Sequence, residues 1–295
     1  MIPGGERSPP PVSGRTSYRR TALANWITDV DDGAGALLAR VIVNRIWQGH
    51  FGRGIVSTPN DFGVQGERPT HPELLDWLAD DLIRHRWNLK RLHKLIMTSA
   101  VYQQNSAFDA VKARTDIDNV SLWRFTPRRL EGEAVRDSVL AVSGLLDRRM
   151  FGAGTLDATM RRRSIYFFVK RSQLVPMMVL FDCPEPLVSI GRRPTTTTAP
   201  QALLLMNDAL IRDAAAGLAQ RVWASERSPA NESIRQAYLR VYARLPRSDE
   251  LHLAEVFLGR QVKRYTEAGN DHAEVVALTD YCQALLASNE FLYIQ

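Results

Sequence analysis

Apolar residues recur every three or four positions along most of this 295-residue chain, and that spacing predicts a mainly helical fold. The clearest stretch is "ALLARVIVNRIW", where one wide helical face would bury Leu37, Leu38, Val41, Ile42, Ile46 and Trp47. A shorter helix is predicted at "TALANWI". Further helices are predicted at about 70–86, 89–104, 129–146, 200–224, 231–243, 248–266 and 272–288. Asn88 is the predicted N-cap of the helix at about 89–104.

The middle of the chain lacks this spacing. In "RRRSIYFFVKRS" the β-branched and aromatic run is short, so a strand is predicted at Ile165–Val169. Proline and glycine then dominate as far as "RRPTTTTAP". We therefore expect two helical lobes around an irregular, arginine-rich middle with a small β element. Residues 1–15 are predicted to be a flexible lead-in, and 16–295 a single helical domain with possible sub-lobes at 16–150 and 195–295.

Composition narrows the class of protein only a little. A hydrophobic content of 45% and a charged content of 24% are those of an ordinary globular protein. The formal net charge of +6 favours anionic partners without naming one. The arginine pairs are dispersed and no nucleic-acid-binding motif accompanies them, so no nucleic-acid partner is predicted.

Several other classes are disfavoured by missing patterns. Cys183 and Cys282 lie far apart, which argues against a disulfide framework, a zinc ribbon or an attached haem but leaves a single disulfide open. The histidines have no metal-ligand spacing, and the paired glycines lack the third glycine of a dinucleotide site. No metal or cofactor is predicted in this chain. No signal peptide and no membrane span are predicted either.

The segment "DFGVQGERPTHPELLDWLADDL" looks catalytic but has a structural explanation. Asp61-Phe62-Gly63 resembles the magnesium-binding tripeptide of protein kinases, yet the other kinase motifs are missing. A turn begun by Asp61, with Gly63 supplying a permissive dihedral angle, is predicted instead. Thr70 and Glu73 have the spacing of a capping box, so helix initiation is favoured over chemistry for this region.

The arginine-rich middle has two interpretations that the sequence leaves open. Arg163, Arg171, Arg192 and Arg193 bracket the predicted strand and the loop after it, and guanidinium groups suit carboxylate, phosphate or sulfate. The alternative, slightly favoured, is internal ion pairing with acidic residues. The candidate partners are Asp137, Asp147, Asp157, Asp182 and Glu185.

Two further stretches, "VNRIW" and "FDCPEP", suggest polar groups inside the fold. Asn44 and Arg45 lie in a strongly apolar helix, so at least one is expected to face a partner inside the protein. A buried guanidinium needs a counter-charge, which Asp61 or Asp182 would supply. We interpret these residues primarily as structural, and a role in a functional site is the second hypothesis.

Several long stretches together resemble a known family, in the family's order. They are "LLARVIVNRIWQGHFGRGIVSTPNDFGVQGERPTHPELLDWLA", "WNLKRLHKLIMTSAVYQQNS", "RRLEGEAVRDSVLAVSG", "RRSIYFFVKR", "AYLRVYARLPRSDE" and "ASNEFLYI". They are similar to the C-terminal domain of planctomycete cytochrome-c-associated proteins, domain of unknown function 1553. The resemblance covers about residues 19–294.

The resemblance implies an extracytoplasmic setting but no established activity and no catalytic residue. Members typically form the last part of a longer polypeptide with a signal peptide, a cytochrome c domain and a second uncharacterised domain. A cytochrome c-type domain or another extracytoplasmic protein is thus the implied partner. The chain begins in what resembles the family's linker, which leaves a fragment, a shortened gene product and a stand-alone copy as alternatives.

Two functional hypotheses follow. The first is a non-catalytic binding or scaffold module of an extracytoplasmic assembly, with anionic groups or an acidic polysaccharide as possible ligands. The second is a hydrolase acting on an acidic or sulfated glycan. In the second, His71 or Asp61 would be the acid or base, and Arg192 and Arg193 would orient the anion.

Overall fold

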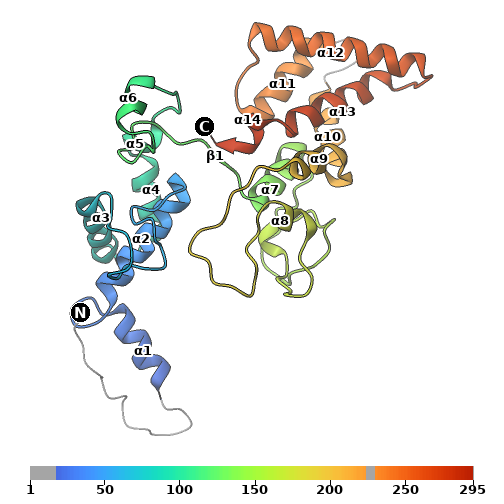
Figure 1. Ribbon diagram of the computed structural model, residues 1–295. Coiled ribbons are helices and arrows are strands. Elements are labelled where there is room, and N and C mark those ends of the chain that lie inside the picture. Colours follow the sequence, from blue (N-terminus) through green and yellow to red (C-terminus); the bar gives the residue numbers. More distant parts are fainter. Residues whose placement is uncertain (1–17, 224–229, 295) are drawn as a thin grey trace. The chain divides into compact units, whose positions relative to one another are not determined.

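The computed structural model describes residues 18–223 and 230–294 and divides the chain into two compact units (Figure 1). Unit 1 ends at Pro127, and unit 2 comprises Arg128–Ile294. The division therefore falls before the predicted boundary at residue 150, and the irregular middle belongs to unit 2. The predicted lead-in, residues 1–15, lies outside the described residues.

Unit 1 is built from short helices around one long one. Its helices are α1 (Arg19–Thr28), α2 (Gly35–Phe51), α3 (Pro72–Arg84), α4 (Leu89–Met97), α5 (Ala100–Gln103) and α6 (Ala110–Thr115). The predicted N-cap at Asn88 is confirmed, because its side-chain oxygen accepts the Arg91 N–H at 3.1 Å. The predicted helix over 89–104 divides in two at Ser99, whose side chain caps α5.

The buried face of α2 differs from the predicted one. Ala39, Val43, Trp47 and Phe51 are buried and lie four residues apart, so they form one narrow stripe. Of the predicted set only Trp47 is buried; the other five side chains are half-buried on the flanks of the stripe. The face was misplaced because the apolar residues of α2 lie on more than one side of the helix, so the sequence does not mark the centre of the buried face.

The predicted capping box at Thr70 is wrong. The helix begins at Pro72, with His71 at the N-cap position and no side-chain cap. The Thr70 N–H donates to the Ile55 carbonyl at 2.9 Å, so it is not free for Glu73. The equivalent bond does form later in the chain, where the Gln201 side chain accepts the Thr198 N–H at 3.3 Å.

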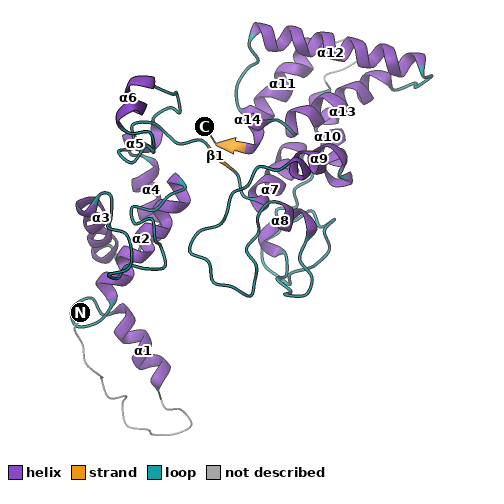
Figure 2. Cartoon of the chain, viewed as in Figure 1, coloured by secondary structure: helices purple, strands orange, loops and turns teal. Residues whose placement is uncertain are grey.

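Unit 2 holds the larger core and the only strands of the described residues (Figure 2). Its elements are β1 (Arg128–Arg129), α7 (Gly132–Ser143), a 3₁₀ turn (Ser164–Tyr166), α8 (Pro176–Leu180), α9 (Ala199–Asn207), α10 (Ala209–Val222), α11 (Ala230–Tyr242), α12 (Ser248–Glu267), α13 (Ala273–Leu286), α14 (Asn289–Leu292) and β2 (Tyr293–Ile294). The predicted helix over 200–224 divides at Asp208, whose carboxylate accepts the Leu210 N–H and caps α10. The predicted helix over 129–146 ends earlier, at Ser143, because Gly144 takes a left-handed conformation with φ of 80°.

The core of unit 2 is centred on α10 and α13. Several of their buried residues are alanines, such as Ala214 and Ala277, whose small side chains let the two helices approach closely. A polar link accompanies the apolar contact: Asp280 of α13 accepts bonds from Arg212 of α10 and from Tyr265 of α12, each at 2.7 Å. Asp280 thereby links all three helices, α10, α12 and α13, to one another.

The small β element exists, but the predicted strand at Ile165–Val169 is wrong. The two strands are β1 and β2, which pair antiparallel with Arg129 opposite Tyr293. Residues 164–166 instead form a 3₁₀ turn, and Ile165 and Val169 are 73% and 69% exposed. A β-branched run favours a strand only where another segment lies alongside, and here Phe167 meets Thr155 in a single isolated bridge.

Both cysteines are free thiols, so the possible disulfide does not form. Cys282 is fully buried on α13, and burial raises its pKa to about 12. Within the described residues no helix is long and apolar enough to cross a membrane, as predicted.

A carboxylate–arginine network fixes the start of α12. The Arg244 guanidinium bonds both oxygens of Glu250 at 2.7 and 2.8 Å and both oxygens of Glu290 at 2.6 and 2.7 Å. The Glu250 carboxylate also accepts the Arg247 N–H at 2.8 Å. The hydrogen bond from Arg244 is the main reason that the pKa of Glu250 is lowered from 4.5 to about 2.

We predict that this network makes stability depend on acid pH. A lowered folded-state pKa stabilises the protein above pH 4.5, and the contribution disappears as the pH falls from 4.5 towards 2. At pH 7, Glu250→Gln should therefore cost roughly 1–3 kcal/mol, after allowance for solvent screening. Thermal midpoints at pH 7 and pH 3 measure this, with Glu267→Gln as a control at an exposed, longer pair with Lys263. An unchanged gap between wild type and Glu250→Gln at the two pH values would contradict the prediction.

Candidate functional site

His71 and Asp61, the sequence candidates for acid–base chemistry, both lie in unit 1 and both serve local structure. Asp61 accepts the Gly63 N–H at 2.8 Å, which is the predicted turn, although Gly63 does not take a positive φ. His71 Nδ1 lies 3.0 Å from the Thr70 hydroxyl at the start of α3. Within the described residues no hydrogen bond or ion pair joins His71 to Asp61. The four candidate arginines belong to unit 2.

The polar pair on α2 divides between the inside and the surface. Asn44 is fully buried, and its amide accepts the Val56 N–H at 2.8 Å and donates to the Val56 carbonyl at 2.9 Å. This is a two-point clasp between α2 and the loop that follows it. Arg45 is exposed and bonds the Asn60 side chain at 3.1 Å rather than Asp61 or Asp182.

Arg193 is held by two carboxylates at the start of α7. Its two terminal nitrogens each bond one oxygen of Glu133 at 2.7 Å, and Nη1 also lies 3.0 Å from Glu131. This fork lowers the pKa of the Glu133 carboxyl, the side-chain bond from Arg193 being the largest cause. The arginine side chain is only 21% exposed. Arg193 is therefore a structural clamp.

Asp182 forms a second clamp just beyond α8. It takes a left-handed conformation with φ of 63° and pairs with the Arg129 guanidinium at 2.5 Å. It also accepts the Thr196 N–H at 2.8 Å and the Thr196 hydroxyl at 2.7 Å. The Arg129 and Asp182 side chains are 4% and 12% exposed, so this is a largely buried ion pair.

The two clamps close a loop that we call the anchored loop, residues 183–196. Between its anchors the loop exposes apolar side chains: Leu187 is 64%, Val188 58% and Ile190 36% exposed. Arg192 is exposed as well, and no hydrogen bond or ion pair joins it to another residue of the described chain. The anchored loop is thus held at both ends and exposes the Arg192 guanidinium beside apolar side chains.

The other two candidate arginines differ from each other. Arg163 Nε lies 3.5 Å from Asp137, one of the predicted partners, although its side chain is 63% exposed. Arg171 is exposed in the turn after the 3₁₀ segment and has no ion pair within the residues that the structure describes. No carboxylate is shared among the four arginines. Two of them are therefore paired with different acids, and two are open to solvent.

Two arginines, Arg129 and Arg136, are buried although the sequence did not predict it. Arg136, on α7, is 1% exposed and donates to the carbonyls of Arg162 and Met160 and to the Ser164 hydroxyl. Burial lowers its pKa, as expected for a guanidinium removed from water. It organises the irregular segment by satisfying main-chain oxygens. Its only sequence signal is its position next to Val135 on the apolar face of the helix.

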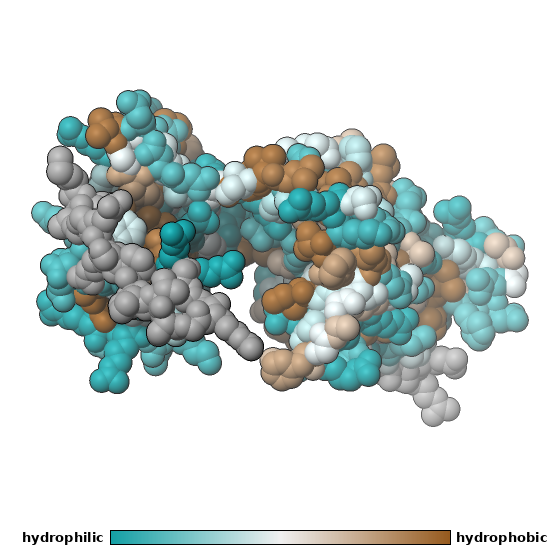
Figure 3. All heavy atoms as spheres, turned by 90° about the horizontal axis from the view of Figure 1, so that it is seen from below, coloured by the Kyte–Doolittle hydropathy of each residue, from teal (hydrophilic) through white to brown (hydrophobic). Residues whose placement is uncertain are grey.

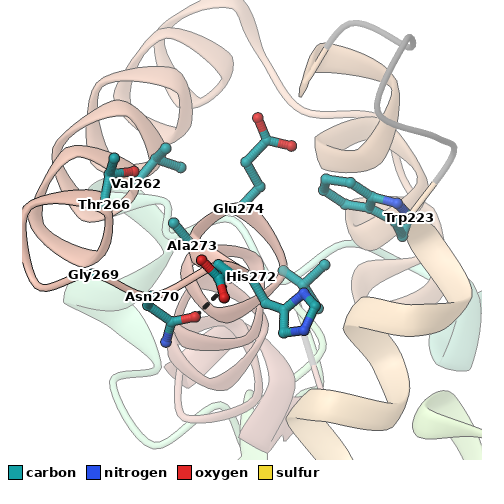
Figure 4. Close-up of a pocket in the computed structure, with 10 residues that line it drawn as sticks. Trp223, Val262, Thr266, Gly269, Asn270, His272, Ala273 and Glu274 are labelled. Carbon is teal, nitrogen blue, oxygen red and sulfur yellow. Dashed lines mark hydrogen bonds between the residues drawn. The ribbon is translucent and has the colours of Figure 1, made fainter.

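A cavity of about 630 Å³ lies elsewhere in unit 2, where α12 turns into α13 (Figure 4). Figure 4 shows Trp223 on one side and Val262 and Thr266 on the other, with the Asn270 side chain accepting the His272 N–H at 2.9 Å. Its charged lining includes Asp271 and Glu274, which does not suit an anion, and none of the predicted site residues lines it. No cluster of three or more potential metal ligands occurs in residues 18–223 and 230–294.

Comparison with known protein families gives a match over most of the chain. Residues 19–258 match the family PSD1, described as a protein of unknown function (DUF1553). No curated protein matches the chain, and no solved structure does. The matched stretch runs from α1 to the middle of α12, and thus covers unit 1 from residue 19, the part of unit 2 up to residue 258 and both clamps. The chain belongs to the DUF1553 family of proteins of unknown function.

Proposed function

We propose that this chain is a non-catalytic binding module and that its anchored loop contacts an acidic protein surface. The observation that carries the proposal is the contrast between two neighbouring arginines. Arg193 is held by Glu133 and Glu131, while Arg192 is exposed and has no counter-charge among the residues that the structure describes. Cationic side chains without partners attract carboxylates, and the neighbouring exposed Leu187 and Val188 add apolar area.

The setting of this binding is proposed from the resemblance to planctomycete cytochrome-c-associated proteins. In that setting the partner is a cytochrome c-type domain or another protein of an extracytoplasmic assembly. Figure 3 shows one face of the molecule, on which apolar residues, in brown, lie among hydrophilic ones. The exposed Leu187 and Val188 of the anchored loop support a protein partner, because such a partner can cover apolar side chains. The local roles of Asp61 and His71 support a non-catalytic module, and in the described part of the chain no contact brings these two residues together as a glycan hydrolase would need.

The proposal predicts that replacing Arg192 weakens the binding of acidic polymers, whereas replacing an arginine outside the anchored loop does not. The probes are poly-L-glutamate, which offers carboxylates alone, and a random glutamate–tyrosine copolymer, which adds apolar rings. The copolymer should bind more tightly to the full chain, and Arg192→Ala should weaken that binding about fivefold or more, the equivalent of roughly 1 kcal/mol. Binding should also weaken as salt rises, because screening acts over about 8 Å at physiological ionic strength.

The controls separate the loop from general charge. Arg260→Ala removes the same charge from an exposed position of α12 and should leave binding unchanged. Val188→Ser should weaken binding of the copolymer more than that of poly-L-glutamate. Equal binding by wild type and Arg192→Ala would refute the proposal. Preferential binding of a sulfated polysaccharide such as heparin would replace the protein partner with an acidic polysaccharide.

A further inference from the structure

Two histidines from different helices of unit 1 meet at their ring nitrogens. His50 lies in the last turn of α2 and His93 in α4, and His50 Nε2 lies 2.8 Å from His93 Nδ1. The rings are tilted by 66° with their centroids 5.1 Å apart. A separation of 43 residues hides this pair from any rule based on spacing within one helix.

The contact has the geometry of a chelate. In a bond between two imidazole rings one nitrogen donates and the other accepts, so at least one lone pair is directed at the meeting point. Imidazole nitrogens bind Zn²⁺ at about 2.0–2.1 Å, which places two nitrogens on one ion roughly 2.9–3.4 Å apart. The observed separation is slightly below that range, so a small rotation of one ring would admit an ion.

The surroundings hold the His50 ring in place and leave the His93 ring free to rotate. His50 is half-buried, and its ring packs edge-on against Tyr102 at a centroid distance of 5.4 Å. Tyr102 in turn contacts Phe51 and Phe125, so His50 stands against an aromatic cluster. His93 is exposed, which gives access from solvent and freedom to rotate.

We infer that His50 and His93 form a two-imidazole site for a divalent transition-metal ion, with water completing the coordination. Nitrogen ligands select Zn²⁺, Ni²⁺ or Cu²⁺ over the oxygen-seeking Mg²⁺ and Ca²⁺. No third histidine, cysteine or carboxylate joins this pair among the described residues, so that part of the chain supplies two ligands. This site departs from the expectation of no metal, which considered single helices alone.

The test is calorimetric titration of the full chain with Ni²⁺ and then with Cu²⁺. Wild type should bind one equivalent at this pair, with Cu²⁺ tighter than Ni²⁺. His93→Gln and His50→Gln should each weaken that binding at least about tenfold, or about 1.4 kcal/mol, because glutamine keeps a hydrogen-bonding group without an imidazole. The control is His252→Gln, which removes an exposed histidine of α12 and should leave binding unchanged.

A thermal readout separates loss of binding from loss of fold. Metal should raise the unfolding midpoint of wild type and of His252→Gln but not that of His93→Gln. His93 is exposed, so its variant should keep the metal-free midpoint of wild type even if His50→Gln unfolds. Undiminished Ni²⁺ binding by His93→Gln would overturn the site, and so would the absence of binding by wild type. Loss in only one of two folded histidine variants would indicate a single ligand and no chelate.

Discussion

Asp182→Ala should destabilise unit 2 by about 3–5 kcal/mol, because it leaves the buried Arg129 guanidinium without its counter-charge. The Arg129 side chain is 4% exposed, so water cannot replace the lost carboxylate. Its Nε and Nη1 atoms already have no hydrogen-bond partner, which makes Asp182 its only acceptor in the described residues. Thr196 would lose two bonds at the same time, and one end of the anchored loop would be released.

Hydrogen exchange read peptide by peptide measures this loss, because the two units need not unfold together. Peptides from α7 and α10 should lose protection in Asp182→Ala, while peptides from α2 should not change. Glu185→Ala is the matched control, since it removes an exposed carboxylate from the same loop and should cost no more than about 0.5 kcal/mol. Equal protection in the two variants would contradict the role given to Asp182.

Asn44→Ala should destabilise unit 1 by about 3–5 kcal/mol, because it strands two main-chain groups inside the protein. Each buried polar group without a partner costs about 1–3 kcal/mol, and a cavity adds to this. Val56 is 2% exposed, so its N–H and carbonyl cannot turn to water. Hydrogen exchange in α2 should show the loss, with protection in unit 2 unchanged.

A second variant tests the same clasp from its other side. A methyl group at Gly54 would lie 2.7 Å from both polar atoms of the Asn44 side chain and 2.6 Å from the Val56 carbonyl, so Gly54→Ala should be as harmful as Asn44→Ala. Asn60→Ala is the control, because it removes an exposed amide that bonds only the exposed Arg45. If Asn44→Ala behaved like Asn60→Ala, the clasp would contribute little to stability.

The features that could be predicted from the sequence are those set by near neighbours. Helical spacing predicts most of the helices, and Asn88 caps its own helix three residues away. The divisions at Ser99 and Asp208 were missed because apolar spacing continues across both of them. The strand was misplaced for the opposite reason: β1 and β2 owe their pairing to residues at distant points of the chain, and neither is longer than two residues.

The candidate site shows the same limit. Arg192 and Arg193 are equivalent in the sequence, yet only Arg193 meets Glu133, which lies 60 residues earlier. Asp182 was singled out as a counter-charge, but its partner proved to be Arg129 rather than Arg45. Local patterns thus identify which residues need partners. The identity of each partner depends on how α7, α8 and the anchored loop pack together.

The pairing of β1 with β2 has a consequence for how the protein is made. The ribosome synthesises β1 at the start of unit 2 and its partner strand, Tyr293–Ile294, at the end of that unit. Unit 1 precedes both and can fold while translation continues, since domains generally fold as units in order of synthesis. The backbone of Arg128 and Arg129 therefore has no strand partner until Tyr293 and Ile294 have left the exit tunnel. A chain that stalls before Tyr293 presents a folded first unit and an open second one, with the backbone of β1 available for pairing with another chain.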